Sequence, residues 1–201
     1  MHTLIPAPLM NKQSESPTLF FATPNDFQHW LHQYNTSVKS IWLKFAKKSS
    51  GIPSITPAEA LEIALCYGWI DGQRKTFDEQ FYINKYTPRR KGSLWSKRNC
   101  KIAMQLIKSK RMTTHGLREI NAAKEDGRWQ NAYDSSKNIQ LPPDFLERLK
   151  KSKKAYTFFT TLNKTNTFAI AFRLQTARKP ETREKRLQKI IEMMKAGQKF
   201  H

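Results

Sequence analysis

The hydrophobic pattern of this chain changes its period near Ser96, and this change constrains the fold most. Before this position the sequence mixes helical stripes with alternating stretches, and residues 40–47 place apolar side chains at every second position. From Ser96 onward only helical periods occur. The sequence therefore predicts an α+β fold: a small, mostly antiparallel sheet of about three strands with helices on one face, followed by a mainly helical C-terminal half.

Residues 18–92 carry the signals of an α-β-α-β-β order. Thr23 precedes an apolar stripe of helical period and has the residue type of a helix N-cap. Thr56 and Glu59 have the spacing of a capping box, in which each side chain bonds to the other's backbone, so a second helix is expected there. Residues 69–87 then indicate a β-hairpin.

The residues after position 92 carry helical signals only. A helix is expected over residues 114–126, because Gly127 is well placed to end it. Further helices are expected to begin at Pro143 and after Ser152. The last helix has an apolar stripe at i, i+3, i+4 and i+7, formed by Leu187, Ile190, Ile191 and Met194.

The charge of the chain is high and uneven. It carries 36 Lys and Arg residues against 16 Asp and Glu residues, a formal charge of +20. We divide the chain into a flexible N-terminal tail (1–17), an α/β subdomain (18–92) and a basic helical subdomain (93–201), which holds most of the excess. Such a field attracts polyanions, nucleic acid among them. Basic side chains that simply solvate the helices are the plainer alternative.

The cysteines and the chain start bear on the compartment. Cys66 and Cys100 lie in apolar helical contexts without further ligands at metal-binding spacing, so we expect buried thiols, no metal and no cofactor. Residues 1–9 lack the basic start of a signal peptide, and no stretch is long and apolar enough to span a bilayer. These features favour a cytoplasmic protein.

Several short motifs occur in fixed order over about residues 20–197. They are Gly68-Trp69-Ile70-Asp71, Thr87-Pro88-Arg89-Arg90, Trp95-Ser96-x-x-Asn99, Ala123-Lys124-x-Asp126-Gly127 and Ala177-x-Lys179-Pro180-Glu181-Thr182-Arg183-x-x-Arg186. In these motifs the chain resembles the YdeI/OmpD-associated (OmdA) family. That resemblance implies a part in bacteriocin or antimicrobial-peptide protection and association with an outer-membrane porin.

The segment between the hairpin and the next helix carries the candidate ligand site. If Ser96 is the N-cap of that helix, the backbone donors of residues 97–99 form a weak anion site. Arg89 and Arg90 lead into it, and the planar fork of arginine suits phosphate or carboxylate. We therefore predict an anionic small molecule or a phosphate-bearing ligand, bound by Asp71, Arg74, Arg89, Arg90, Trp95, Ser96 and Asn99.

Three alternatives stay open at this point. Asp71 can pair with Arg89 or Arg90 and join the hairpin to the helix without a ligand. A small enzyme can use Asp71 as acid or base beside these arginines, but the sequence holds no nucleophile elbow, phosphate loop or dinucleotide pattern, which disfavours an enzyme. A nucleic-acid-associated protein can act through its whole basic surface, including a C-terminal patch of Lys179, Arg183 and Arg186.

Overall fold

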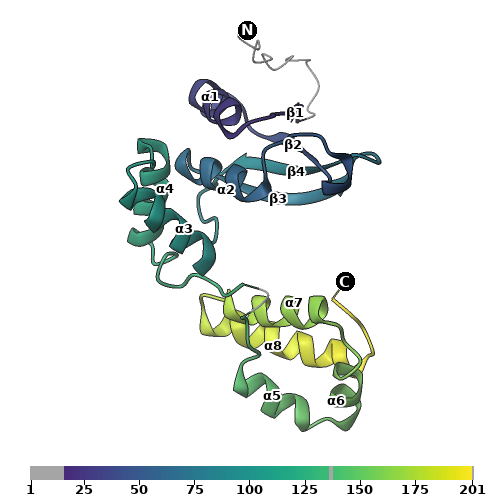
Figure 1. Cartoon of the computed structure of the whole chain (residues 1–201). Coiled ribbons are helices and arrows are strands. Elements are labelled where there is room, and N and C mark those ends of the chain that lie inside the picture. The colour runs from purple at the N-terminus through teal and green to yellow at the C-terminus, as the bar shows by residue number, and fades with distance from the viewer. Residues whose placement is uncertain (1–15, 136–137, 201) are drawn as a thin grey trace. The chain divides into compact units, whose positions relative to one another are not determined.

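The computed structural model describes residues 16–135 and 138–200 of the chain (Figure 1). The predicted tail of residues 1–17 lies outside this range, apart from its last two positions. The chain forms two compact units, which are Met1–Ser93 with Asn99–Trp129 and Leu94–Arg98 with Gln130–His201. Each unit has secondary structure of its own.

The first unit is built on one sheet, whose strands lie in the order β1-β2-β4-β3. Strand β2 (Ile41–Ala46) pairs antiparallel with β4 (Phe81–Pro88), and β4 pairs antiparallel with β3 (Trp69–Thr76). Strand β1 (Thr18–Phe20) runs parallel to β2. The α+β prediction is confirmed, but the sheet has four strands rather than about three. With three residues, β1 is too short to show an alternating pattern.

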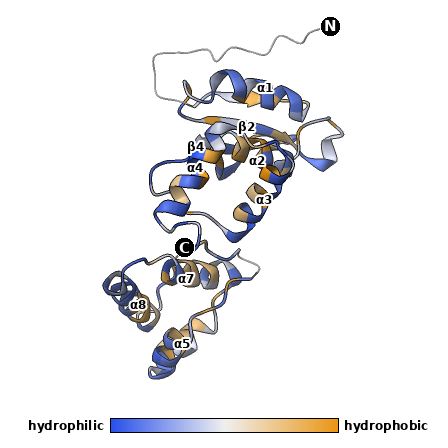
Figure 2. Cartoon of the chain, turned by 90° about the vertical axis from the view of Figure 1, so that its left-hand side faces the viewer, coloured by the Kyte–Doolittle hydropathy of each residue, from blue (hydrophilic) through white to orange (hydrophobic). Residues whose placement is uncertain are grey.

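Helices α1 (Pro24–Tyr34) and α2 (Pro57–Cys66) cover one face of this sheet and contact each other. The ring of Trp30 in α1 meets Trp69 of β3 edge-on, with 6.1 Å between centroids. Hydropathy colouring shows α2 as a largely hydrophobic helix, whereas hydrophobic and hydrophilic residues alternate along α8 (Figure 2). The face of the sheet beneath the helices is buried at every second position of β2, namely Ile41, Leu43 and Phe45.

Most of α3 (Lys97–Lys108) and all of α4 (Thr114–Glu125) belong to the first unit. The sequence instead assigned residues 93–201 to a single helical subdomain. The cause is a contact that periodicity does not reveal: α4 begins against the C-terminal end of α2, where the amide and the hydroxyl of Thr113 both donate to the Cys66 carbonyl, at 3.3 and 2.5 Å. Gly116 makes this close approach feasible.

The second unit is helical, with α5 (Pro143–Lys150), α6 (Lys153–Phe159), α7 (Lys164–Gln175) and α8 (Pro180–Lys195). Ser152 caps α6 by accepting from the Ala155 amide, as its position in the sequence predicts. Bidentate ion pairs join Arg148 to Glu184 and Arg183 to Asp144, which ties α5 to α8. The core is formed by Phe145, Leu149, Ala155, Ile170, Leu174, Leu187, Ile190, Ile191 and Met194.

The capping box of α2 gives a pH-dependent prediction. The Glu59 carboxylate accepts from the Thr56 amide at 2.8 Å and from the Thr56 hydroxyl at 2.7 Å, and these bonds hold the pKa of Glu59 below its ordinary value. A carboxylate with a lowered pKa stabilises the fold above its ordinary pKa, and that stabilisation is lost as pH falls through the lowered value. We expect Thr56→Ala to lower the unfolding free energy by about 1 kcal/mol at pH 7.

The same substitution is expected to cost clearly less once Glu59 is protonated, because the bonds that favour the ionised carboxylate are then weakened. Urea unfolding of both proteins at pH 7 and at about pH 3 measures the two differences. An equal cost at both pH values would show that the Glu59 carboxylate does not stabilise this helix start.

Candidate functional site

The segment after β4 is a closed turn, which we call the arginine turn (Arg89, Arg90, Lys91, Gly92 and Ser93). The amide of Arg89 donates to the Gly68 carbonyl at 2.9 Å and so extends the pairing of β3 with β4. The amide of Arg90 donates to Ser93 Oγ, and the amide of Ser93 donates to the Arg90 carbonyl, both at 2.9 Å. Gly92 has φ +83°, which suits the third position of a type II turn. The backbone of the turn is therefore fixed.

A buried arginine just after the end of α4 holds this turn in place. Arg128 is 4% exposed, and its Nη1 donates to the Ser93 carbonyl at 2.8 Å. Its Nε lies 2.7 Å from each carboxylate oxygen of Asp126. Sequence reasoning missed Arg128, although it directly follows the Asp126-Gly127 motif. Because Arg128 bonds the turn backbone, it contributes to the shape as well as to the charge of this region.

The arginine turn presents three consecutive cations in two environments. Arg89 is buried, with 7% of its surface exposed, whereas Arg90 and Lys91 are exposed. Burial raises the pKa of the Cys100 thiol to about 11, and the positive charge of Arg89 opposes that rise. The Arg89 guanidinium thus exerts its field on α3. The arrangement offers one buried and two accessible positive charges on a rigid turn, which can hold an oxyanion.

Two of the predicted site residues lie further along the hairpin. Asp71 pairs in register with Tyr86, and Arg74 pairs with Asn84. Arg74 Cζ lies 3.7 Å from the ring centroid of Tyr82. Because Asn84 lies five residues before Arg89, Arg74 is about 17 Å from the turn along the strand. The structure therefore does not bring Arg74 together with the arginine turn.

Three further predicted residues lie at the start of α3. Trp95, Ser96 and Asn99 are all buried, and the first two fall in the second unit. There the amide of Lys97 donates to the Tyr133 carbonyl at 2.9 Å, and the amide of Tyr133 donates to the Trp95 carbonyl at 3.0 Å. From the sequence, the amide of Lys97 is expected to be a free donor at a helix N-terminus. That expectation is wrong for this amide, because a distant carbonyl occupies it.

The predicted C-terminal cationic patch is partly engaged within the second unit. Arg183 donates to both carboxylate oxygens of Asp144, at 2.6 and 2.8 Å, and these bonds hold the pKa of Asp144 below its usual range. Arg186 Nη1 donates to the Arg173 carbonyl at 2.8 Å. Lys179 is exposed at the N-cap of α8. The two arginines thus bond to other residues of the second unit. The patch therefore offers fewer uncommitted cations than the sequence suggests.

The sheet has a second face, opposite α1 and α2, that sequence reasoning did not treat as a site. Lys75 and Lys85 place their Nζ atoms 4.8 and 5.6 Å from the Trp42 ring centroid. The sequence signal for this face was the alternation in residues 40–47, which places Trp42 and Lys44 on the other side of the strand from the buried positions. We call this surface the lysine–aromatic face, formed by Phe20, Trp42, Lys44, Lys75, Phe77, Phe81 and Lys85.

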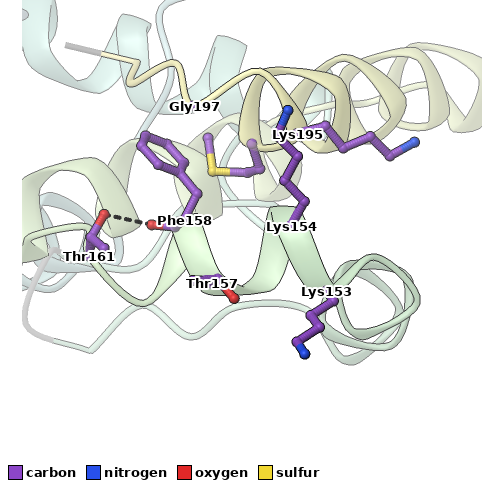
Figure 3. Close-up of a pocket in the computed structure, with 8 residues that line it drawn as sticks. Lys153, Lys154, Thr157, Phe158, Thr161, Lys195 and Gly197 are labelled. Carbon is purple, nitrogen blue, oxygen red and sulfur yellow. Dashed lines mark hydrogen bonds between the residues drawn. The ribbon is translucent and has the colours of Figure 1, made fainter.

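A groove of about 630 Å³ lies in the second unit between α6 and α8 (Figure 3). Its lining is mostly apolar and includes Phe158 and Met194, and the stems of Lys153, Lys154 and Lys195 lie along it. Lys195 Nζ pairs with Glu192 at 2.9 Å.

Comparison with known families assigns the C-terminal segment. Residues 138–197 match the family described as "Bacteriocin-protection, YdeI or OmpD-Associated" (OmdA). Residues 138–197 therefore form an OmdA domain. The match covers α5 to α8 and, of the quoted motifs, contains only the one at residues 177–186. The predicted resemblance is thus confirmed, but it rests on the helical unit rather than on the hairpin.

The N-terminal part of the chain has a second match. Residues 19–119, about half of the chain, match a domain of unknown function (DUF8412). That range contains the sheet, α3 and the arginine turn. Searches of curated proteins and of solved structures gave no match. Across the described residues of the chain, the helices are too short or too polar to cross a membrane.

Proposed function

We propose that this protein binds a small anionic ligand, such as a phosphate-bearing molecule, at the arginine turn. The observation that carries the proposal is a fixed turn backbone that presents two exposed cations, Arg90 and Lys91, directly after the buried Arg89. Reciprocal hydrogen bonds between Arg90 and Ser93 close the turn, and Arg128 donates a further hydrogen bond to the Ser93 carbonyl. A preformed turn loses little conformational entropy on binding, which favours affinity for a small ligand.

The charges of the turn favour an oxyanion over other ligands. Guanidinium groups bind phosphate and carboxylate oxygens through paired N–H donors, and such charge-assisted bonds are about twice as strong as neutral ones. Arg90 is exposed and can move to meet a ligand, whereas Arg89 is fixed by burial. In this proposal Arg90 supplies the accessible contact and Arg89 supplies a local positive field.

The family description names bacteriocin protection. A chain with a formal charge of +20 repels a cationic antimicrobial peptide, so direct capture of such a peptide is electrostatically unfavourable. We propose that any protective role of this chain acts through an anionic ligand instead. The same charge makes acidic partners the ones that the protein attracts at long range.

Arg90→Ala tests this proposal with inorganic pyrophosphate as the probe. We expect the wild-type protein to bind pyrophosphate saturably in isothermal titration calorimetry, and Arg90→Ala to weaken binding by at least about tenfold, since a charged hydrogen-bond partner is lost. The variant should remain folded because Arg90 is exposed and its backbone bonds do not depend on its side chain.

Arg178→Ala is the matched control, because Arg178 is an equally charged and exposed arginine between α7 and α8. It should bind pyrophosphate as the wild type does. Equal weakening by both substitutions would mean that only the overall charge matters. Undetectable pyrophosphate binding by the wild type would also overturn the proposal.

A further inference from the structure

We propose that the lysine–aromatic face binds single-stranded nucleic acid, with bases stacked on its rings and phosphates held by its lysines. This site is separate from the arginine turn and does not depend on it. Aromatic rings interleaved with basic side chains on an exposed sheet surface are what single strands require, because every base has a π-face and every linkage carries a charge.

Pairing of the strands places these side chains on one face. Trp42 of β2 lies opposite Lys85 of β4, and Phe20 of β1 lies opposite Lys44 of β2. Continuing across the sheet, Lys44 lies opposite Ile83, which in turn lies opposite Lys75 of β3. Cations therefore neighbour rings on this face, with the aliphatic side chain of Ile83 between Lys44 and Lys75.

The rings on this face are accessible and form two groups. Phe20 is 38% exposed and Phe77 is 48% exposed, and Phe20 meets Phe81 edge-on at 5.7 Å. Trp42 is half-buried and lies between two lysines. Trp42 and Lys44 are two residues apart, so one group follows the other within about 7 Å along the strand. A single strand crossing the sheet can therefore meet both groups.

The face is positively charged. Among the described residues, no strand position that shares this face in the register carries an acid. One carboxylate reaches this face from the hairpin end, where Asp78 Oδ2 lies 3.9 Å from Lys44 Nζ. Lys75 is exposed and Lys85 is half-buried, and both ammonium groups lie near the Trp42 ring, where they can meet the phosphate of a base stacked there.

These features favour a single strand over a duplex, because paired bases hide their faces inside the stack and cannot reach Trp42 or Phe20. They also favour tolerance of sequence, since stacking and lysine contacts do not read base edges. If three lysines each neutralise one phosphate, the slope of log affinity against log salt should be about −2.

Fluorescence anisotropy with a labelled oligothymidine of about 16 nucleotides tests this proposal. We expect saturable binding, with weaker binding of a duplex of the same length. The double substitution Lys75→Gln with Lys85→Gln should weaken binding by at least about tenfold and reduce the salt slope to about −0.7. Trp42→Leu should weaken binding by about tenfold with little change in that slope.

The matched control is the double substitution Lys150→Gln with Lys151→Gln. It removes the same charge from two exposed lysines at the end of α5. It should leave oligothymidine binding within about twofold. Equal losses in both double variants, or equal affinity for the duplex, would overturn the proposal. If Trp42→Leu fails to fold, the lysine variants still test the proposal. They should stay folded, because they change only the ends of exposed or half-buried side chains. Arg90→Ala should leave this binding unchanged, so failure here is distinct from failure of the anion-binding proposal.

Discussion

Gly116→Ala is expected to destabilise the first unit by about 3 kcal/mol or more. A Cβ atom at this position would lie 2.5 Å from the Cys66 carbonyl oxygen and 2.6 Å from that of Leu65. It would also meet the Met112 sulfur, and although that flexible side chain can move aside, the two carbonyl oxygens belong to the backbone at the end of α2 and cannot. Helix α4 must shift, which also strains the bonds from Thr113 to Cys66. Urea unfolding followed by circular dichroism measures the loss.

Gly72→Ala is the matched control for this prediction. A Cβ atom there would lie 3.6 Å from the Lys85 carbonyl oxygen, an ordinary van der Waals distance, and the backbone of Gly72 does not have a positive φ. We expect the control to change the unfolding free energy by less than about 1 kcal/mol. If the two substitutions lowered the unfolding free energy equally little, that result would contradict the close packing of α4 on α2 at Gly116.

Phe145→Ala is expected to cost about 3–5 kcal/mol and to unfold the second unit preferentially. Phe145 is fully buried in the core of α5 to α8 and meets the Phe159 ring edge-on at 6.1 Å. Removing the ring leaves a cavity that short, mutually braced helices can fill only in part. Because the first unit has its own core around Trp30 and Trp69, the tryptophan fluorescence should persist, apart from the contribution of Trp95 in the second unit, while helical ellipticity falls.

Tyr156→Ala is the control, since Tyr156 is an aromatic residue of α6 that is 42% exposed. It should cost less than about 1 kcal/mol. A single cooperative transition of the Phe145→Ala protein, with fluorescence and ellipticity lost together, would show that the two compact units do not unfold separately.

Local signals in the sequence were sufficient for most helices. The Thr23 and Thr56 caps bond as their spacing predicts, and the stripe of Leu187 and Ile190 faces the core of the second unit. These features depend on residues three or four positions apart, whose geometry a helix fixes by itself. The strand of residues 40–47 also followed from a local pattern, because side chains two positions apart lie on the same face of a strand.

Long-range contacts could not be inferred in this way. Nothing local indicates that Gly116 allows α4 to join the first unit, or that Arg183 meets Asp144 39 positions away. The candidate site shows the same limit, because the role of Arg128 depends on a carbonyl 35 positions earlier. The arginines of the turn were identifiable from residue type, whereas the partners that fix the turn depend on tertiary structure.

The most direct test of anion binding at the arginine turn is an NMR titration of the arginine side-chain Nε–Hε signals with pyrophosphate. We expect the signals of Arg89 and Arg90 to shift saturably, with Arg178 unaffected as an exposed reference. Signals of Arg89 and Arg90 that stay in place at saturating pyrophosphate, or shifts spread evenly over all exposed arginines, would contradict the proposed site.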